Sequence, residues 1–431
     1  MSALTSVTVI GGGAVGLATA YYLRKADLDV TVIESGRPGH ATSWGNGGWL
    51  SPVLSIPTPG PGVPRMGITE TFQRGSAVAI RPLAAPSMVP WLLRFARHCT
   101  RTAFQNGSAG LGALSRGMFD GFDELTDLGV PVEIPRHGNL RACLTEAEAR
   151  HQLAELAPMR AAGYTVPHEI MGQEEIHELE PALSDQVRYG FNLPDERHVD
   201  PGAFCEALAG HLVARGVRLH TGTAVTAVHT SGGRVTGVET TAGPVRTDAL
   251  VIAAGLDSRR IAAWLGTRLP LRAGKGYSFF VPSGHSPAHP LYLSHTKVGV
   301  TPLPGGFRVL GGMEIADETL RINPRVVRGM IRLARRYLRH MPANESLSEL
   351  SQLWAGLRPM TPDGLPIIDR LPGLPNAYVN TGHGMLGVGL SMVSGAALTP
   401  FMLNGRRPGV LAPFGVDRPR ARTSPVALPA S

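Results

Sequence analysis

The first group of residues suited to chemistry lies in a glycine-rich turn near the start of the sequence. Gly11, Gly13 and Gly16 in "VIGGGAVGLATAYYL" follow a β-branched stretch and precede an apolar pattern of helical period. A second stretch, "DVTVIES", then ends in Glu34. This order of strand, G-x-G-x-x-G turn, helix, strand and acid binds dinucleotides, with pyrophosphate at the helix N-terminus and the acid on a ribose. It favours a dinucleotide site over a chance glycine turn, and the acid argues against a 2′-phosphate.

A second glycine-rich turn lies close to the other end, in "NTGHGMLGVGLSMVSG", residues 380–395. It holds a lone histidine, His383, and runs into an apolar stretch at helical spacing. Free backbone N–H groups in such a turn can hold an anion. The sequence therefore predicts two anion-holding turns, at opposite ends of one chain.

The segment after Glu34 indicates which dinucleotide is bound. A nicotinamide enzyme continues at once with further strand–helix units, whereas here "SGRPGHATSWGNGGWLSP" and the proline-rich "TPGPGVP" follow. Such a loop suits backbone amides packed against a large flat cofactor, which favours FAD. The alternative is a surface Ω-loop.

Composition sets wider limits. A chain of 431 residues suits two closely joined domains. The charge balance, 41 basic against 33 acidic residues or +8, is compatible with anionic ligands, nucleic acid or a membrane surface. Cys99, Cys143 and Cys205 show no paired spacing, so we expect reduced thiols and neither a disulfide framework nor a metal site. The charge-poor start lacks the basic region of a signal peptide, and glycines and Pro400 interrupt the late apolar stretch, so we expect a cytoplasmic protein.

The pattern along the chain predicts an α/β fold with a discontinuous Rossmann-type domain. A buried strand ending in Ala253, Ala254 and Gly255 returns the chain to the nucleotide-binding sheet after a mainly helical stretch. The remaining segments form an α+β substrate domain with a mixed or antiparallel sheet. The predicted parts are FAD-binding at 1–64, 191–268 and 351–405, substrate domain at 65–190 and 269–350, and a disordered tail at 406–431.

From Val7 to about Gly405 the sequence resembles the FAD-dependent D-amino-acid oxidase superfamily, and within it the bacterial D-amino acid dehydrogenases. The motifs that carry the resemblance are the first glycine turn with Glu34, "SWGNGGWLSP", "KGYS", "WAGLRPMTPDGLPII" and "NTGHGMLG". The resemblance implies oxidative deamination of a D-amino acid or a similar small amino or imino acid. Hydride passes to flavin N5, the imine hydrolyses to a 2-oxo acid and ammonia, and a quinone-type acceptor takes the electrons.

The resemblance also assigns one end of FAD to each turn. The first turn holds the pyrophosphate, and the late turn lies against the pyrimidine edge of the flavin, where reduction places negative charge. Gly45 stands where some relatives attach FAD to a histidine, so we expect non-covalent FAD. The predicted cofactor-binding residues are Gly11, Gly13, Ala14, Val15, Gly16, Glu34, Ser35, Thr42, Ser43, Trp44, Gly45, Asn46, Gly47, Gly48, Val225, Ala253, Ala254, Gly255, Gly356, Gly382, His383, Gly384, Met385 and Leu386.

Arg358, in "GLRP", is the candidate for gripping the substrate. A guanidinium can make two parallel hydrogen bonds to a carboxylate, and the matching arginine of related amino-acid oxidases holds the substrate carboxylate. The alternative is a structural arginine paired with Asp363 or Asp369.

Three further residues are candidate catalytic residues by the same resemblance. Tyr277, in "GKGYS", is either a phenol contact to the substrate or a core tyrosine. Lys297 matches a lysine of the dehydrogenases, but His295 and Thr296 stand where a tyrosine usually precedes it, so substrate size and identity stay open. His383 is expected to be a flavin neighbour or loop organiser in preference to a general base.

The run "RVVRGMIRLARRYLRH" places five arginines on one helical stripe: Arg325, Arg328, Arg332, Arg335 and Arg339. A solvated face is the simpler interpretation, and peripheral membrane binding is the alternative that the respiratory dehydrogenases favour. No nucleic-acid module is recognisable. Two other functions stay open: an oxygen-dependent oxidase of glycine, sarcosine, a cyclic imino acid or a specialised amine, and a flavin-binding protein without turnover.

Overall fold

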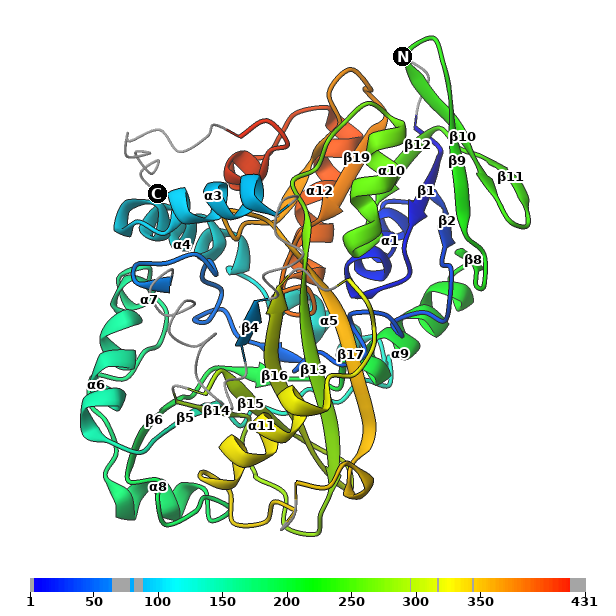
Figure 1. Cartoon of the computed structure of the whole chain (residues 1–431). Coiled ribbons are helices and arrows are strands. Elements are labelled where there is room, and N and C mark those ends of the chain that lie inside the picture. The colour runs from blue at the N-terminus through cyan, green and yellow to red at the C-terminus, as the bar shows by residue number, and fades with distance from the viewer. Residues whose placement is uncertain are drawn as a thin grey trace.

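The computed structural model describes residues 4–63, 78–80, 88–294, 296–315, 318–342 and 345–418, with the backbone alone for 78–80. Figure 1 shows two halves. A smaller sheet with its helices lies at the upper right, and long strands of a larger sheet run through the centre toward the lower half. His295 lies outside the described residues.

The smaller sheet is the nucleotide-binding sheet, with strand order β18-β19-β12-β1-β2-β8. Every pairing in it is parallel except that of β18 with β19. Its central strands β1, β2, β12 and β19 are short and almost entirely buried, as expected when both faces are covered. They span β1 (Ser6–Ile10), β2 (Asp29–Ile33), β8 (Arg218–His220), β12 (Ala249–Ile252), β18 (Ile367–Arg370) and β19 (Ala377–Thr381).

Helices α1 (Ala14–Lys25), α9 (Pro201–Ala214) and α12 (Ser391–Asn404) share one apolar core with this sheet. A second core joins its other face to a three-stranded sheet of β9 (Val225–Ser231), β10 (Arg234–Thr240) and β11 (Gly243–Arg246), and to α10 (Ser258–Trp264) after the short helix η2 (Gly255–Asp257). The layers confirm the predicted Rossmann-type architecture.

The larger sheet has the order β17-β13-β16-β15-β14-β5-β6, with β4 added to β16. It is mixed, since β14 pairs with β5 and β16 with β4 in parallel while the other pairs are antiparallel. Its strands are β4 (Val78–Ile80), β5 (Asn139–Cys143), β6 (Tyr189–Leu193), β13 (Arg272–Pro282), β14 (Leu291–Leu293), β15 (Val298–Leu303), β16 (Gly306–Ile315) and β17 (Ser351–Met360). Helix α11 (Pro324–Arg335) packs its apolar stripe on one face.

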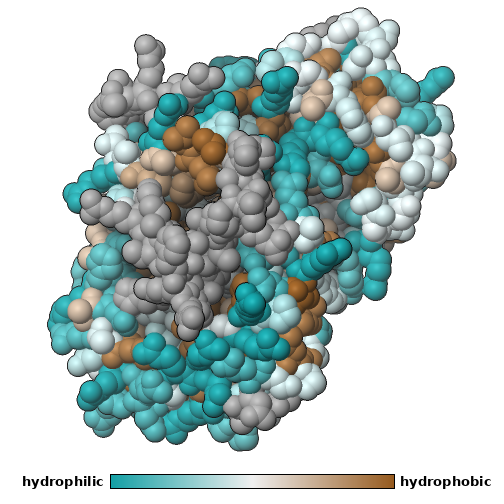
Figure 2. Space-filling view, in the orientation of Figure 1, coloured by the Kyte–Doolittle hydropathy of each residue, from teal (hydrophilic) through white to brown (hydrophobic). Residues whose placement is uncertain are grey.

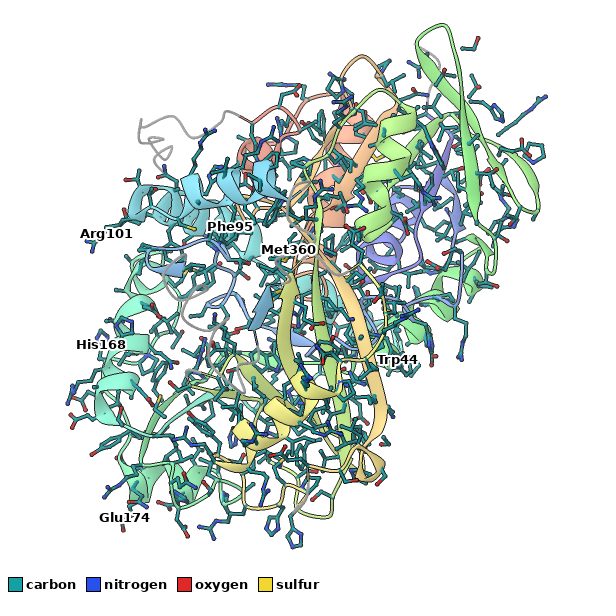
Figure 3. The ribbon with its side chains drawn as sticks, viewed as in Figure 1. Trp44, Phe95, Arg101, His168, Glu174 and Met360 are labelled. Atoms are coloured by element: carbon teal, nitrogen blue, oxygen red, sulfur yellow. The ribbon has the colours of Figure 1, made fainter. Side chains whose placement is uncertain are left out.

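The remaining helices surround these two sheets. Residues of α4 and α5 join the core of the nucleotide-binding half, and Ile176 of α8 joins that of the larger sheet. Figure 3 shows Phe95 of α3 beside Met360 at the end of β17, where the two residues share a small apolar cluster. The bounds of these helices are α3 (Val89–His98), α4 (Arg101–Ser115), α5 (Asp120–Asp127), α6 (Glu146–Glu155), α7 (Ala157–Ala161) and α8 (Gln173–Leu179). The short helix η3 (Leu347–Glu349) precedes β17.

Two predicted domain boundaries differ from the observed sheets. β6 and β17 both belong to the larger sheet, so the segments that return to the nucleotide-binding sheet begin after Leu193 and after Met360. The pairing partners of the two strands, and not their sequences, assign them to the larger sheet. β7 (Arg197–His198) then pairs with β3 (Trp49–Leu50), next to the first cofactor loop.

The predicted disorder from residue 406 is wrong as far as Arg418. Residues Gly409–Phe414 form the helix η4, and its Leu411 and Phe414 are buried in the core of the nucleotide-binding half. Arg418 then makes two hydrogen bonds, of 2.5 and 2.7 Å, to the carboxylate of Asp363. Proline and arginine content suggested disorder, but two apolar anchors and one ion pair hold this segment. Residues 419–431 lie outside the described residues.

Within the described residues, no helix is both long enough and apolar enough to cross a bilayer. Polar residues dominate the face shown in Figure 2, and the lower part of that face, where α11 lies, is strongly hydrophilic. The arginines of the predicted stripe are exposed, and two of them pair with acids: Arg332 with Glu345 and Arg339 with Asp185.

Candidate functional site

The first glycine turn brings the start of α1 against the end of β12. Gly11 has φ +111°, and a Cβ on it would lie 2.5 Å from the carbonyl oxygen of Ala253. A Cβ on Gly16 would lie 1.9 Å from the carbonyl oxygen of Gly11. Helix α1 starts at N-cap Gly13 with no side-chain cap and no acid in its first turn. The turn is therefore a close-packed helix N-terminus suited to an anion such as a pyrophosphate.

Glu34 connects this turn with the loop that follows β2. Its Oε2 accepts a hydrogen bond from the N–H of Gly12 at 2.7 Å, and its Oε1 accepts one from the N–H of Gly36 at 2.8 Å. The carboxylate lines the groove described below and so fixes the backbone on both sides of the predicted ribose position.

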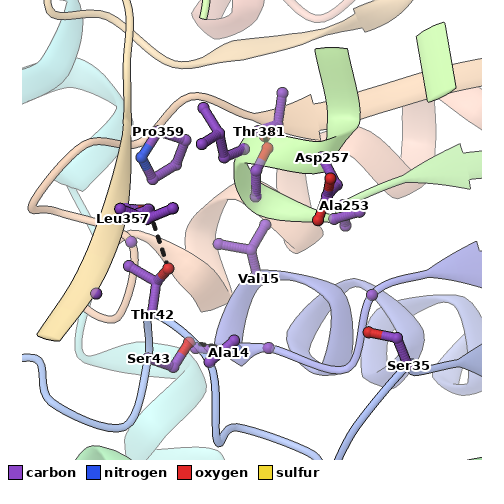
Figure 4. Close-up of a pocket in the computed structure, with 18 of the residues that line it drawn as sticks. Ala14, Val15, Ser35, Thr42, Ser43, Ala253, Asp257, Leu357, Pro359 and Thr381 are labelled. Carbon is purple, nitrogen blue, oxygen red and sulfur yellow. Dashed lines mark hydrogen bonds between the residues drawn. The ribbon is translucent and has the colours of Figure 1, made fainter. Parts of the chain in front are cut away.

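The loop after Glu34 ties the nucleotide-binding half to the edge of the larger sheet. Thr42 Oγ1 donates to the carbonyl oxygen of Leu357 at 3.0 Å, and Ser43 Oγ accepts from the N–H of Ala14 at 3.1 Å. Figure 4 shows both bonds, with Val15 and Ala253 on the neighbouring wall. The loop is thus part of the site and not a free Ω-loop.

A groove of about 480 Å³ runs between α1, the carboxyl ends of β1, β2 and β12, and strand β17. Of the predicted cofactor-binding residues, its lining includes Gly11, Gly13, Ala14, Val15, Glu34, Ser35, Thr42, Ser43, Asn46, Val225, Ala253, Ala254, Gly255, Gly356, Gly382, His383 and Gly384. A ligand crevice at the carboxyl ends of parallel strands is the expected position for a dinucleotide. The glycine contacts of the groove and the N-terminus of α1, whose N-cap glycine has no capping side chain, fit an FAD molecule, and Glu34 lies at the predicted adenosine end.

The late glycine turn meets the first one in space. Gly382 and Gly384 have φ of +77° and +55°, and the N–H of Gly384 donates to the carbonyl oxygen of Pro359 at 3.1 Å. A Cβ on Gly387 would lie 3.9 Å from the side chain of Val15. Helix α12 begins only at Ser391, and its Gly395 lies directly against the backbone of Ala18 in α1. The two turns therefore line one groove.

His383 is buried inside the late turn. Its Nε2 lies 3.2 Å from Ser394 Oγ, and burial lowers its pKa to about 3. The imidazole is thus neutral at physiological pH and a weak base, which matches an organiser of the turn better than a proton acceptor.

Arg358 lies on the face of the larger sheet that carries Trp354 and Gly356. Its Nη1 donates to the carbonyl oxygen of Gly312 at 2.9 Å, and its Nη2 lies 3.5 Å from that of Gly311. Both carbonyls belong to a bulge in β16, where the pairing with β13 shifts register between Lys275 and Tyr277. The bulge directs two carbonyl oxygens at one guanidinium.

Neither predicted carboxylate pairs with Arg358. Asp363 binds Arg418, and Asp369 lies 3.5 Å from Arg407. Burial lowers the pKa of Arg358 to about 10, so the guanidinium remains charged at neutral pH. With carbonyls as its protein partners, it keeps its positive charge for a ligand.

Tyr277 lies on the opposite face of the sheet. It is fully buried in the core under α11, where its hydroxyl donates to the carboxylate of Glu314, and it is absent from the groove lining. The strand register makes the core tyrosine the correct alternative, because side chains alternate between the two faces. Lys297 is exposed on the turn between β14 and β15, and its carbonyl oxygen lies beside Gly311.

Seven predicted cofactor residues are absent from the groove lining: Gly16, Trp44, Gly45, Gly47, Gly48, Met385 and Leu386. Met385 among them is exposed. The Trp44 ring stacks on His40 with centroids 4.0 Å apart and lies against Gly202. The ring of Trp354 packs against Gly45, where a Cβ would lie only 2.1 Å from it. These glycines make room for neighbouring side chains, a role that their spacing does not reveal.

The sequence prediction missed several groove residues. Trp354, four residues before Arg358 on the same strand, lines the groove. Thr381 also lines it and donates to the carbonyl oxygen of Gly255 at 2.9 Å. Arg259 and Glu318 also line it and form a two-point ion pair of 2.8 and 2.6 Å between the two halves. The "WAGLRP" motif contains Trp354, but no local signal connects Arg259 with Glu318. The other missed residues are Ile10, Ile33, His40, Ala41, Thr223, Ala224, Leu256, Asp257, Arg260, Ile261, Leu320, Ala355, Leu357, Pro359, Asn380, Gly387 and Val388.

The family model described as FAD dependent oxidoreductase (DAO) matches residues 6–400. The chain belongs to this family. It is 34% identical over 426 residues to a D-amino acid dehydrogenase of Bradyrhizobium diazoefficiens, covering 96% of this chain and 98% of that protein. A D-amino acid dehydrogenase of Cereibacter sphaeroides is 33% identical, with 96% and 95% covered. The protein is therefore an FAD-dependent oxidoreductase, homologous to D-amino acid dehydrogenases.

Solved structures share the fold at lower identity. Glycine oxidase from Bacillus cereus superposes with a TM-score of 0.71 at 20% identity, covering 97% of this chain and all of that one. L-proline dehydrogenase from P. horikoshii gives 0.72 at 18%, with 97% and 98% covered. These neighbours confirm the fold.

Proposed function

We propose that the protein oxidises a D-amino acid or a similar small amino or imino acid to its imine, which hydrolyses to the 2-oxo acid and ammonia. The observation that carries the proposal is Arg358, a charged guanidinium held by two carbonyl oxygens. Arg358 is absent from the groove lining, but its chain neighbours Leu357 and Pro359 belong to it. The D-amino acid dehydrogenases to which the chain is homologous support the substrate class. FAD, when bound, supplies the acceptor for the hydride that leaves the substrate Cα.

Arg358 is proposed to hold the substrate carboxylate. A guanidinium has five N–H donors in a planar fork, so donors remain after its bonds to Gly312 and Gly311. The carbonyl contacts and the close approach to Gly276 fix the plane of the fork. A fixed fork grips a carboxylate at two points and thereby orients the Cα–H bond.

Proton transfer requires little of the protein in this proposal. The substrate amine enters as the neutral form, and His383, buried with a pKa near 3, is unsuited to take a proton at neutral pH. The protein's own contribution is to orient the substrate at Arg358 and to present the N–H groups of the late turn.

The decisive experiment is anaerobic mixing of the purified yellow protein with D- and L-amino acids while the flavin absorbance is followed. Bleaching by D-amino acids is expected. If no amino or imino acid bleaches the flavin, the proposal fails in favour of a flavin-binding protein without turnover.

We further propose a quinone-type electron acceptor, as in a dehydrogenase. Slow reoxidation of the bleached protein in air, accelerated by a quinone dye, supports it, whereas fast reoxidation in air indicates an oxidase. Peripheral membrane binding through the exposed arginines of α11 is part of the same proposal, with Arg325, Arg328 and Arg335 as its cationic contacts. Co-sedimentation with anionic but not neutral vesicles tests it.

A further inference from the structure

Another buried arginine of the larger sheet stands on β5, five strands from the β17 strand of Arg358. Arg141 of β5 is only 9% exposed, and its guanidinium carbon lies 4.0 Å from the centre of the Tyr292 ring. Its Nε is buried without a partner, and within the described part of the chain its side chain donates no hydrogen bond. A buried guanidinium with unused donors is unusual, because an unsatisfied buried charge is costly.

Neighbouring groups are unsatisfied as well. Both amide atoms of Asn139, two positions before Arg141 on the same strand face, are buried without a partner. Glu196 is joined to this strand, since its carbonyl oxygen accepts from the N–H of Gly138 at 3.0 Å. Its Oε1 accepts from the N–H of Val53 at 3.1 Å, but its Oε2 has no partner. Unsatisfied donors and acceptors gathered at one place indicate a missing polar occupant.

The surrounding acids do not neutralise Arg141. Burial raises the pKa of Glu196 to about 8, so its carboxyl is mostly protonated at neutral pH. Burial likewise raises the pKa of the Cys143 thiol to about 11. Glu155 also acts on Arg141, but its side chain is exposed and lies 3.5 Å from His151. Within the described residues, the Arg141 guanidinium therefore has no anion in hydrogen-bond contact.

We propose that Arg141 and Asn139, beside the Tyr292 ring, form a binding site for a small monocarboxylate. A guanidinium stacked on an aromatic ring presents its N–H fork at the edge, in the geometry that a carboxylate accepts at two points. The amide of Asn139 and the carboxyl of Glu196 supply neutral polar contacts. One positive charge matches one carboxylate.

This site is separate from the carboxylate grip proposed for Arg358. In the sheet order, β5 lies five strands from β17, which is about 24 Å along the sheet at ~4.8 Å per strand. The proposal is that the occupant is a second molecule, and the Arg358→Lys protein tests this, because it should keep the response of the Arg141 site. That the occupant is a second molecule rests on the proposed function, whereas its binding is independent of turnover.

Trp49 provides a connection to the cofactor groove and a reporter. Its ring lies 6.4 Å from that of Tyr292, and its Nε1 donates to Thr301 Oγ1 at 2.9 Å. Trp49 directly follows the loop whose Thr42, Ser43 and Asn46 line the groove. Occupation of the Arg141 site is therefore expected to change tryptophan fluorescence.

The test titrates the FAD-loaded protein with acetate and propionate in a zwitterionic buffer free of other carboxylates, and records Tm and tryptophan fluorescence. Parent and Arg358→Lys proteins should both show a rise in Tm and a saturable fluorescence change. Arg141→Met should weaken the apparent affinity at least about tenfold. Without carboxylate, Arg141→Met should melt at or above the parent temperature, because an uncompensated buried charge has been removed.

Arg197→Met is the matched control. Arg197 also stacks on a ring, 4.1 Å from the centre of Phe119, but it is paired with Asp123 at 2.6 Å. Its replacement should lower Tm and leave the carboxylate response intact. The proposal is overturned if the parent gives no saturable response, which means that the site holds water only. It is also overturned if Arg141→Met responds like the parent, or if Arg358→Lys alone loses the response. If amino acids do not bleach the flavin, the proposed function is refuted, but the carboxylate titration still tests binding at Arg141.

Discussion

Gly276 provides the space that the guanidinium of Arg358 occupies. A Cβ on Gly276 would lie 2.2 Å from Arg358 Cζ, and the two residues stand on adjacent strands, with Gly276 opposite Gly356. The glycine of "KGYS" and the arginine of "GLRP" are thus two parts of one structure, although 81 positions separate them.

Gly276→Ala should therefore displace Arg358 without removing it. We expect a rise in KM of roughly ten- to hundredfold for amino acids, since a misplaced fork loses one or more charge-assisted hydrogen bonds of about 1.5–3 kcal/mol. Flavin content should stay at the parent level. Steady-state kinetics on samples of matched flavin content measure the effect, and an unchanged KM would show that Arg358 does not contact the substrate.

Arg358→Lys should be damaging although the charge is kept, because an ammonium lacks the planar two-point grip. The expected loss is roughly one to two decades in kcat/KM. Arg358→Ala should lose more and should also abolish the preference for amino acids over the corresponding amines, which lack the carboxylate. The rate ratio of amino acid to amine is the deciding measurement: a ratio equal to that of the parent refutes the carboxylate role.

Asp363→Asn tests whether Asp363 contributes to the substrate site or only to the stability of the fold. Burial alone would raise the pKa of Asp363, but the Arg418 guanidinium outweighs it and holds the pKa below its usual value. Breaking this pair leaves a partly buried charge, so we expect destabilisation on the order of 3 kcal/mol. Denaturant unfolding should show this loss, while the amino acid-to-amine ratio stays unchanged. A changed ratio with parental stability would place Asp363 in the substrate site.

Glu34→Ala should weaken FAD retention. The carboxylate accepts the N–H groups of Gly12 and Gly36, and in the proposed site also the ribose hydroxyls, so charge-assisted hydrogen bonds of about 1.5–3 kcal/mol each are removed. Turnover at saturating FAD should change less. Dialysis followed by flavin absorbance measures retention, with Glu34→Gln as the isosteric comparison, and full retention in the Ala variant would contradict the ribose assignment.

Acid should destabilise the protein partly through His383. Its folded pKa, about 3, lies below the ordinary value of 6.5, so below pH 6.5 the unfolded chain gains a proton that the folded chain refuses. This contribution to stability is complete above pH 6.5 and is lost as pH falls toward 3. At pH 5 the loss amounts to about 2 kcal/mol. The melting temperature of His383→Gln should therefore fall less than that of the parent between pH 7 and pH 5. Equal slopes would show that another group, such as His198, governs the acid response.

Several parts of this protein are determined by sequence over short distances. The glycine turn, the alternating strand before it and the acid after the second strand lie within 30 positions, and each follows from local steric and hydrogen-bonding needs. The Rossmann-type half, its discontinuity and part of the groove lining were therefore predictable. The buried strand ending in Ala253 was recognisable for the same reason: nearly continuous apolar residues fit a parallel strand covered on both faces.

Other features depend on tertiary structure alone, because they rest on which strands pair and on which face each side chain points. The bulge in β16 directs two carbonyl oxygens at Arg358, and the register places Tyr277 in the core on the other face. Asp363 has Arg418, 55 positions away, as its partner, and no periodicity carries that information. Arg141 is an ordinary arginine in the sequence, and only burial beside Tyr292 without an anion distinguishes it. Local spacing specifies backbone geometry, whereas desolvation and charge pairing are properties of the packed molecule.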